Sequence, residues 1–340
     1  MHLDLNLIWY FLVGILLTGY AILDGFDMGV GALHLFTKTD RDRRIMLNAI
    51  GPVWDGNEVW LVTGGGALFA AFPDVYATVF SGFYMAFILL LVALIFRAVA
   101  IEFRGKQPMG WWHQVWDVSF SLSSIVSSLL IGVALGNLIW GVPIGPDKEF
   151  QGNFFTLIHP YSLMVGVLVL AAFTMHGAIY ATMKTEGDLH EQARRWVRSS
   201  MIFFVAAYMI TTFATLLYVP HMSATIRQCP VLLLLPLVNV LAIANIPRAI
   251  SKGKDFKAFL SSCVSLFSLM ALFGVGMMPN LVYSSLDPQN SLTLYNAASS
   301  HKTLGIMLVI ALIGMPLVVG YTVSIYWIFR GKVRLENTSY

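Results

Sequence analysis

The stretch GYAILDGFDMGVG, residues 19–31, lies inside an apolar run that extends from Leu5 to Phe36. A run of about 20 apolar residues is enough to cross a bilayer, so this segment predicts a transmembrane helix. Asp24 and Asp27 therefore fall at membrane depth, where each charged carboxylate costs roughly 2.5–3.5 kcal/mol. A pair of acids at that cost indicates a functional site inside the membrane.

The composition extends this interpretation to the whole chain. Of its 340 residues 57% are hydrophobic and 11% are charged, whereas a soluble domain carries about 25% charged residues. We therefore expect an all-α polytopic membrane protein, because helices satisfy their own backbone hydrogen bonds in lipid. The first apolar run is too long for a cleavable signal peptide. The sequence has no basic stripe that would predict a nucleic-acid partner, and Cys229 and Cys263 lack the spacing of a metal site or disulfide framework.

Nine segments are long and apolar enough to be predicted as membrane spans. They cover residues 7–36, 46–72, 75–103, 115–140, 155–184, 197–219, 230–250, 256–278 and 304–329. The second and third are separated only by Pro73-Asp74, which favours a tight turn. The loops are too short to fold alone, so residues 1–340 are predicted to form a single integral-membrane domain.

The basic residues give an independent test of this count. Cytoplasmic loops collect Lys and Arg, and with nine spans 18 of the 21 basic residues fall on one side of the membrane. Only Lys148, Arg227 and Lys302 fall on the other side. The N-terminus is therefore predicted to be outside, which would be the periplasm if the protein is bacterial, and the C-terminus in the cytoplasm.

Four acids and one arginine are predicted to meet between the first three spans. Asp24 and Asp27 in span one, and Asp55 and Glu58 in span two, are each three residues apart and so lie on one helix face. Asp27 and Asp55 both lie about 14 Å from the cytoplasmic ends of their helices. Arg97, near the end of span three, lies at a slightly shallower depth.

This cluster cannot be fully ionised. One arginine neutralises about one carboxylate, and like charges in a low dielectric force some acids to hold protons. That is the condition for passing protons one at a time, so we favour a proton path. The alternative is that the acids only clamp the helices together by hydrogen bonds. Close helix packing is also expected at the glycines of spans one and two, Gly25, Gly29 and Gly64-Gly65-Gly66.

Histidines could indicate haem ligation by this chain. His159 and His176 are 17 residues apart on one helix, or about 25 Å, too far to share an iron. His34 approaches His176 only if the packing allows it, so histidines with satisfied hydrogen bonds are the preferred interpretation. Trp54, beside Asp55, fits either plain packing or the wall of a quinone or haem-adjacent pocket.

Specific motifs extend almost from end to end of the chain. They are GYAILDGFDMGVGAL (19–33), RRIMLN (43–48), GPVWDGNEVWLVTGGGALFAAF (51–72), FSGFYMAFILLLVALIFR (80–97), IGVALGN (131–137), GNFF (152–155) and the terminal Tyr340. With these motifs the chain closely resembles subunit II of the bd-type quinol oxidases, respiratory terminal oxidases of the bacterial inner membrane. Its short region between spans six and seven resembles the cyanide-insensitive branch of that family.

The resemblance implies a partner and a division of labour. Subunit I of such a heterodimer holds two b haems and one d haem, or a b haem in its place, and oxidises quinol while dioxygen is reduced to water. Subunit II has a nine-helix fold of four-helix bundles and ligates no iron. The resemblance leaves open whether small single-helix accessory subunits join the complex, which quinone it uses and whether a quinone binds in this subunit.

The resemblance also assigns roles to individual residues. It implies that Asp24, Asp27 and Asp55 supply cytoplasmic protons to the oxygen-reducing haem, and that Trp54 and Arg97 border a structural quinone in some members. Glu58 stands where related chains carry an amide, which puts its share in the proton path in doubt. Two other hypotheses remain open from the residues alone: an independent proton- or cation-coupled transporter, and a chain that is itself a b-type cytochrome.

Overall fold

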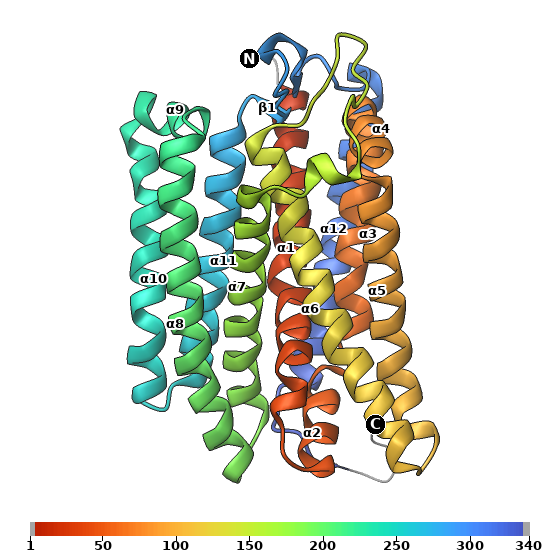
Figure 1. Cartoon of the computed structure of the whole chain (residues 1–340), viewed down its shortest axis with the longest axis vertical. Helices are drawn as coiled ribbons and strands as arrows, with labels where there is room; N and C mark the ends of the chain where they lie inside the picture. The colour runs from red at the N-terminus through yellow and green to blue at the C-terminus, as the bar shows by residue number, and fades with distance from the viewer. Residues whose placement is uncertain (1–3, 336–340) are drawn as a thin grey trace.

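A computed structural model describes residues 4–335, so the predicted match at Tyr340 lies outside the described residues. The α-helices are α1 (Leu5–Leu33), α2 (Asp40–Ile50), α3 (Trp54–Ala71), α4 (Pro73–Gly82), α5 (Tyr84–Phe103), α6 (Gly110–Trp140), α7 (Pro160–Lys184), α8 (Gly187–Tyr218), α9 (His221–Gln228), α10 (Leu234–Ser251), α11 (Asp255–Met277) and α12 (His301–Ile328). Short 3-10 turns lie at His34–Phe36, Arg104–Lys106, Phe154–Leu157, Pro230–Leu233 and Pro288–Asn290. The long helices run side by side as one bundle (Figure 1).

A small antiparallel sheet interrupts the predicted all-α fold at one end of the bundle. It pairs β1 (Asn280–Val282) with β2 (Leu292–Thr293). The segment after α6 joins it through a bridge between Val142 and Ser284. Both predicted outer loops therefore fold together, because each supplies backbone partners to the other.

Among residues 4–335, eight helical segments are long and apolar enough to cross a membrane. They are Leu5–Phe36, Tyr84–Lys106, Gly110–Trp140, Pro160–Lys184, Gly187–Tyr218, Pro230–Ser251, Asp255–Met277 and His301–Ile328. The predicted span 46–72 is not among them. It breaks at residues 51–53 around Pro52, and the shorter α3 carries Asp55, Asn57 and Glu58 in its first two turns. Helix α3 nevertheless packs along α1 inside the bundle (Figure 1), and the nine-span count and the sidedness stay predictions.

Two further boundaries differ from the sequence prediction. The predicted span 75–103 is divided at Phe83 into α4 and α5, and Pro73 opens α4 because proline is tolerated in the first turn of a helix. The predicted basic loop before span six is mostly helical. Helix α8 begins at Gly187, which has a positive φ of 60°, and so includes Arg194, Arg195 and Arg198.

Glycines set the contact between α1 and α7. A Cβ added at Gly29 would lie 1.9 Å from the carbonyl oxygen of Phe173, and one at Gly177 would lie 2.4 Å from the carbonyl carbon of Gly29. The predicted close packing at Gly29 is confirmed. For Gly65 and Gly66 it is wrong, because a Cβ on either would meet nothing within 4 Å.

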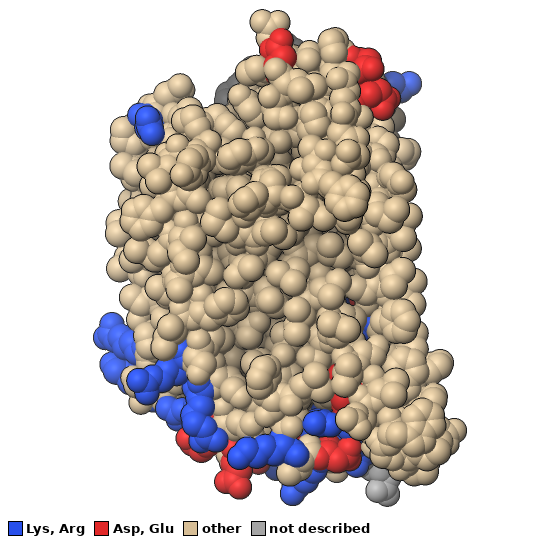
Figure 2. Space-filling model, viewed as in Figure 1, with Lys and Arg blue, Asp and Glu red and all other residues tan. Residues whose placement is uncertain are grey.

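Charged side chains gather at one end of the bundle. Figure 2 shows Lys and Arg concentrated at the end where α8 begins and α10 ends, while the middle of the visible face carries almost no charge. This asymmetry agrees with the sidedness predicted from the loops.

Candidate functional site

The predicted cluster centres on an ion pair between α1 and α5. Arg97 donates through Nη1 to Oδ2 of Asp24 at 3.0 Å, and through Nη2 to the other oxygen of the same carboxylate. Both side chains are completely buried. The fork of the guanidinium thus matches one carboxylate, which is the strongest geometry that this pair can adopt.

Asp27, one turn further along α1, is less well satisfied. Its Oδ2 accepts a hydrogen bond from Nδ2 of Asn57 at 2.7 Å and lies 4.0 Å from Nη2 of Arg97. Its Oδ1 is buried and has no hydrogen-bond partner among residues 4–335. A charged carboxylate in that state loses hydration that the protein replaces only in part, so the arrangement favours a bound proton.

Asn57 connects this acid to the last helix of the chain. Its Nδ2 also donates to the carbonyl of Leu23 at 3.2 Å, and its Oδ1 accepts a hydrogen bond from the hydroxyl of Tyr326 at 2.9 Å. Neither Asn57 nor Tyr326 was among the predicted site residues. The amide in the WDGN motif, three residues after Trp54, was the available signal.

Glu58 connects the cluster to the surface of the chain. Its Oε1 accepts from Nη1 of Arg97 at 3.1 Å, and its side chain is 25% exposed. Asp55, one turn earlier on α3, is exposed and is not among the ion pairs of Arg97. Three acids therefore meet at Arg97, and the fourth predicted acid, Asp55, lies outside this direct contact but near enough for its charge to act on Glu58.

The geometry leaves an excess of acid over base. Asp24, Asp27 and Glu58 all lie within 4.0 Å of Arg97, while the guanidinium carries a single charge. Full ionisation of three carboxylates around one arginine is excluded in this low dielectric. The arrangement therefore favours a bound proton on at least one of these acids, and Glu58 is the one of the three whose side chain is partly exposed.

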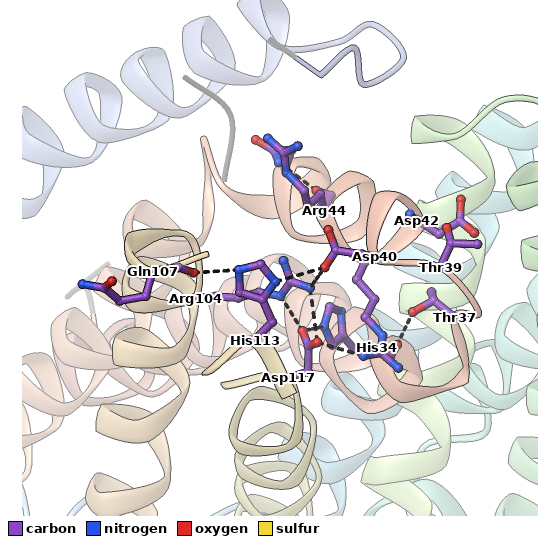
Figure 3. A network of polar contacts seen from close by, with 12 residues as sticks. His34, Thr37, Thr39, Asp40, Asp42, Arg44, Arg104, Gln107, His113 and Asp117 are labelled. Carbon is purple, nitrogen blue, oxygen red and sulfur yellow. Dashed lines mark hydrogen bonds and ion pairs between the residues drawn. The ribbon is translucent and has the colours of Figure 1, made fainter. Parts of the chain in front are cut away.

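A second polar network lies nearer the basic end of the bundle (Figure 3). Asp117 on α6 is completely buried, and its Oδ1 lies 2.6 Å from Nε2 of His34 and 2.6 Å from Nε of Arg104. Its Oδ2 accepts from Arg43 at 2.9 Å. Arg104 continues to Oδ1 of Asp40 at 2.6 Å.

Sequence reasoning did not single out Asp117, although it is a carboxylate inside the predicted span 115–140. Here the charges match, because the carboxylates of Asp117 and Asp40 meet the guanidiniums of Arg43 and Arg104. Burial acts to raise the pKa of Asp40, but the hydrogen bond and charge of Arg104 outweigh it and hold the pKa below its usual value. This network is a charge-neutral clamp that joins α2 and α6 to the 3-10 turns that follow α1 and α5.

The histidines inside the bundle are engaged by the protein. Nδ1 of His176 lies 2.7 Å from Oγ of Ser262, and Nε2 lies 3.0 Å from the carbonyl oxygen of Ile22. Its ring is stacked on Phe259 at 4.9 Å between centroids. The interpretation as a histidine with satisfied hydrogen bonds is confirmed for His176, whereas His34 is hydrogen-bonded through Nε2 only and its buried Nδ1 has no partner among residues 4–335. Within residues 4–335 no three His, Cys, Asp or Glu side chains are grouped so as to hold a metal ion.

Trp54 lies in the main apolar core and is 8% exposed. It contributes to packing, as one of the two predicted alternatives requires. A quinone pocket bordered by Trp54 and Arg97 stays a prediction.

Comparisons with known proteins agree with these features. The sequence model of the family described as "Cytochrome bd terminal oxidase subunit II" matches residues 5–329. The chain is 37% identical over 364 residues to subunit 2 of the cytochrome bd-I ubiquinol oxidase of Escherichia coli K12, covering 98% of this chain and 96% of that one. It is 36% identical over 333 residues to subunit 2 of the cytochrome bd ubiquinol oxidase of Bacillus subtilis 168, covering 97% of each. A chain in the structure of the bd oxidase from Geobacillus thermodenitrificans has the same fold, with a TM-score of 0.79 at 17% identity over 96% of this chain and 98% of that chain.

Proposed function

Because this chain belongs to the family of cytochrome bd terminal oxidase subunit II, we propose that its buried acids carry protons toward the oxygen-reducing site of the assembled complex. The chain is a component of a quinol oxidase, a multi-pass membrane protein whose family implies a partner subunit I and haem in the complex. A free-standing transporter is not favoured, since the family match covers residues 5–329.

The observation that carries the proposal is the unbalanced charge around Arg97. A low-dielectric interior passes protons only through titratable groups or water. The acids here form a gradient of burial, from exposed Asp55 through partly exposed Glu58 to fully buried Asp24 and Asp27. Arg97 holds the charge of one carboxylate at a time, and the other acids hold the protons.

Each acid has a distinct part in this path. Asp55 and Glu58 collect protons at the surface of α3, toward the predicted cytoplasmic side. Asp24 stays paired with Arg97 and fixes the position of the guanidinium. Asp27, with one buried oxygen that lacks a protein partner, is the acid best placed to take up and release a proton.

The remaining chemistry belongs to the partner. We infer from the family that subunit I holds two b haems and one d haem, or a b haem in its place; in this chain both ring nitrogens of the buried His176 are engaged by other residues. The haems supply electrons to dioxygen, and quinol supplies electrons to the complex. When the protons for water come from the cytoplasmic side of the bacterial inner membrane, each turnover moves charge across it. We also propose that Trp54 and Arg97 border a structural quinone. The subunit composition of the purified complex tests whether small accessory subunits join it.

The test replaces Asp27 with Asn in the assembled complex and measures quinol-dependent oxygen uptake per haem. We expect at least about a tenfold loss, the scale of a removed proton-transfer group, with haem content unchanged. The Asp55→Asn variant tests the outer end of the path in the same assay. Full activity of both variants at normal haem content would sink the proton path, whereas loss of haem would show that the acids serve assembly.

A further inference from the structure

A groove separates α8 from α10 at the basic end of the bundle, far from the acids around Arg97. It encloses about 770 Å³. Basic and apolar side chains share its lining, with Arg195 and Arg198 at the end of the bundle and Met201, Val205 and Pro247 further in. Lys and Arg are visibly concentrated at this corner of the molecule (Figure 2).

The groove follows from how the helices pair. Helix α8 packs on α7 and α10 packs on α11, and the two pairs are joined through α7 and α11, which leaves a seam with few direct contacts between α8 and α10. Pro247 inside α10 and the small exposed Ala206 on α8 leave the seam open. Arg194 spans it at the basic end, where Nη2 donates to the carbonyl of Ile250 at 2.6 Å.

Two guanidiniums remain available at this end. Arg195 and Arg198 are exposed, and their guanidinium groups make no hydrogen bond or ion pair with any other residue of the described part of the chain. They lie three residues apart and so share one helix face. Glu191, one turn earlier, is the acidic residue that also lines the groove, which leaves a positive balance around its mouth.

We propose that this groove binds an anionic phospholipid of the cytoplasmic leaflet. Guanidinium groups match the planar, bidentate geometry of a phosphate, and basic pockets between helices on this side of a membrane suit lipid head groups. The apolar lining continues from Arg198 to Val205, about 10 Å along α8. This apolar wall can pack against an acyl chain, whereas a soluble phosphate has no apolar group to place against it.

The test uses the assembled oxidase complex in detergent, with native mass spectrometry as the readout. The probes are phosphatidylglycerol and phosphatidylcholine with the same acyl chains. Wild type should retain phosphatidylglycerol in preference to phosphatidylcholine. In the Arg195→Gln/Arg198→Gln variant the ratio of the two affinities should fall by about thirty-fold. The matched control, Lys38→Gln/Arg41→Gln, removes two exposed charges at the same end of the bundle and should keep the preference.

Two further experiments distinguish binding of the whole lipid from binding of its head group and from attraction by charge alone. Ala206→Trp fills the groove without removing charge and should abolish retention of phosphatidylglycerol while haem content stays normal. Glycerol 3-phosphate should not displace the bound lipid. Unchanged retention in Arg195→Gln/Arg198→Gln or in Ala206→Trp overturns the proposal, as does an equal loss in the control or displacement by glycerol 3-phosphate.

Discussion

The two buried polar networks of this chain lie about two helical turns apart along the same helices, yet their charge balance is opposite. Asp27 and His34 are seven residues apart on the first helical segment, and Arg97 and Arg104 are seven apart on the segment of α5, or about 10 Å in each case. Around Arg97 three acids share one guanidinium. Around Asp117 the carboxylates and guanidiniums are equal in number.

The difference separates structure from function. The network around Asp117 is charge-balanced in one protonation state, so it fixes α2 and α6 against the turn that follows α5 and has no need to bind or release a proton. An unbalanced network has several protonation states of similar free energy, which is what proton transfer requires. The two networks should therefore respond differently to mutation.

The largest effect on stability is expected from Asp117→Asn. The change leaves Arg43 and Arg104 without their shared carboxylate, and breaking a buried ion pair on one side costs about 3–5 kcal/mol. Thermal unfolding of the purified complex and the yield of haem-loaded protein measure it. We expect a large loss of yield with normal oxygen uptake per remaining haem; a well-folded complex with reduced turnover would instead give Asp117 a role in proton transfer.

A smaller loss of stability is expected from Arg97→Gln. The acids left behind can become neutral by binding protons, whereas the arginines left by Asp117→Asn cannot lose theirs. The cost should be about 1–3 kcal/mol, that of unpaired but neutral polar groups. Thermal unfolding of the purified complex measures this cost. A loss of stability as large as that of Asp117→Asn would contradict the distinction between the two networks. Oxygen uptake per haem should fall more than in Asp117→Asn.

Tyr326→Phe tests the edge of the unbalanced network. It removes the hydrogen bond to Oδ1 of Asn57 and so frees the amide that orients Asp27. We expect about 1 kcal/mol of stability to be lost, together with a drop in oxygen uptake of less than tenfold. Tyr321→Phe on the exposed side of α12 is the matched control. Equal activity in both variants would show that the hydrogen bond between Tyr326 and Asn57 does not affect the proposed proton path.

The smallest effect belongs to Asp40→Asn, at the rim of the balanced network. The Asp40 side chain is 56% exposed, and exposed ion pairs contribute at most about 1 kcal/mol. The midpoint temperature of thermal unfolding of the complex should change little, and oxygen uptake per haem should stay the same. A loss like that of Asp117→Asn would show that the clamp depends on its rim.

The sequence was sufficient to predict the bundle, the polar content of its first helix and most of the Arg97 cluster. The free-energy cost of a carboxylate at membrane depth was enough to identify Asp24 and Asp27 as candidate site residues. The sequence-based prediction placed Asp55 beside Arg97 because it assumed a continuous second span, whereas a new helix begins after the break at Pro52. The Asp117 network was missed because Asp117 is the only acid in the predicted span 115–140 and lies near its end, so no second acid on the same helix face marked a site.

The most direct measurement of the central claim follows charge movement during a single turnover of the complex in vesicles. Dioxygen is supplied to the reduced enzyme, and the electrical signal of proton uptake is compared between wild type and Asp27→Asn. If the unbalanced acids carry protons, the electrical phase slows by about tenfold or more while the preceding electron transfer between haems keeps its rate. An unchanged electrical phase in a complex with normal haem content would contradict the account.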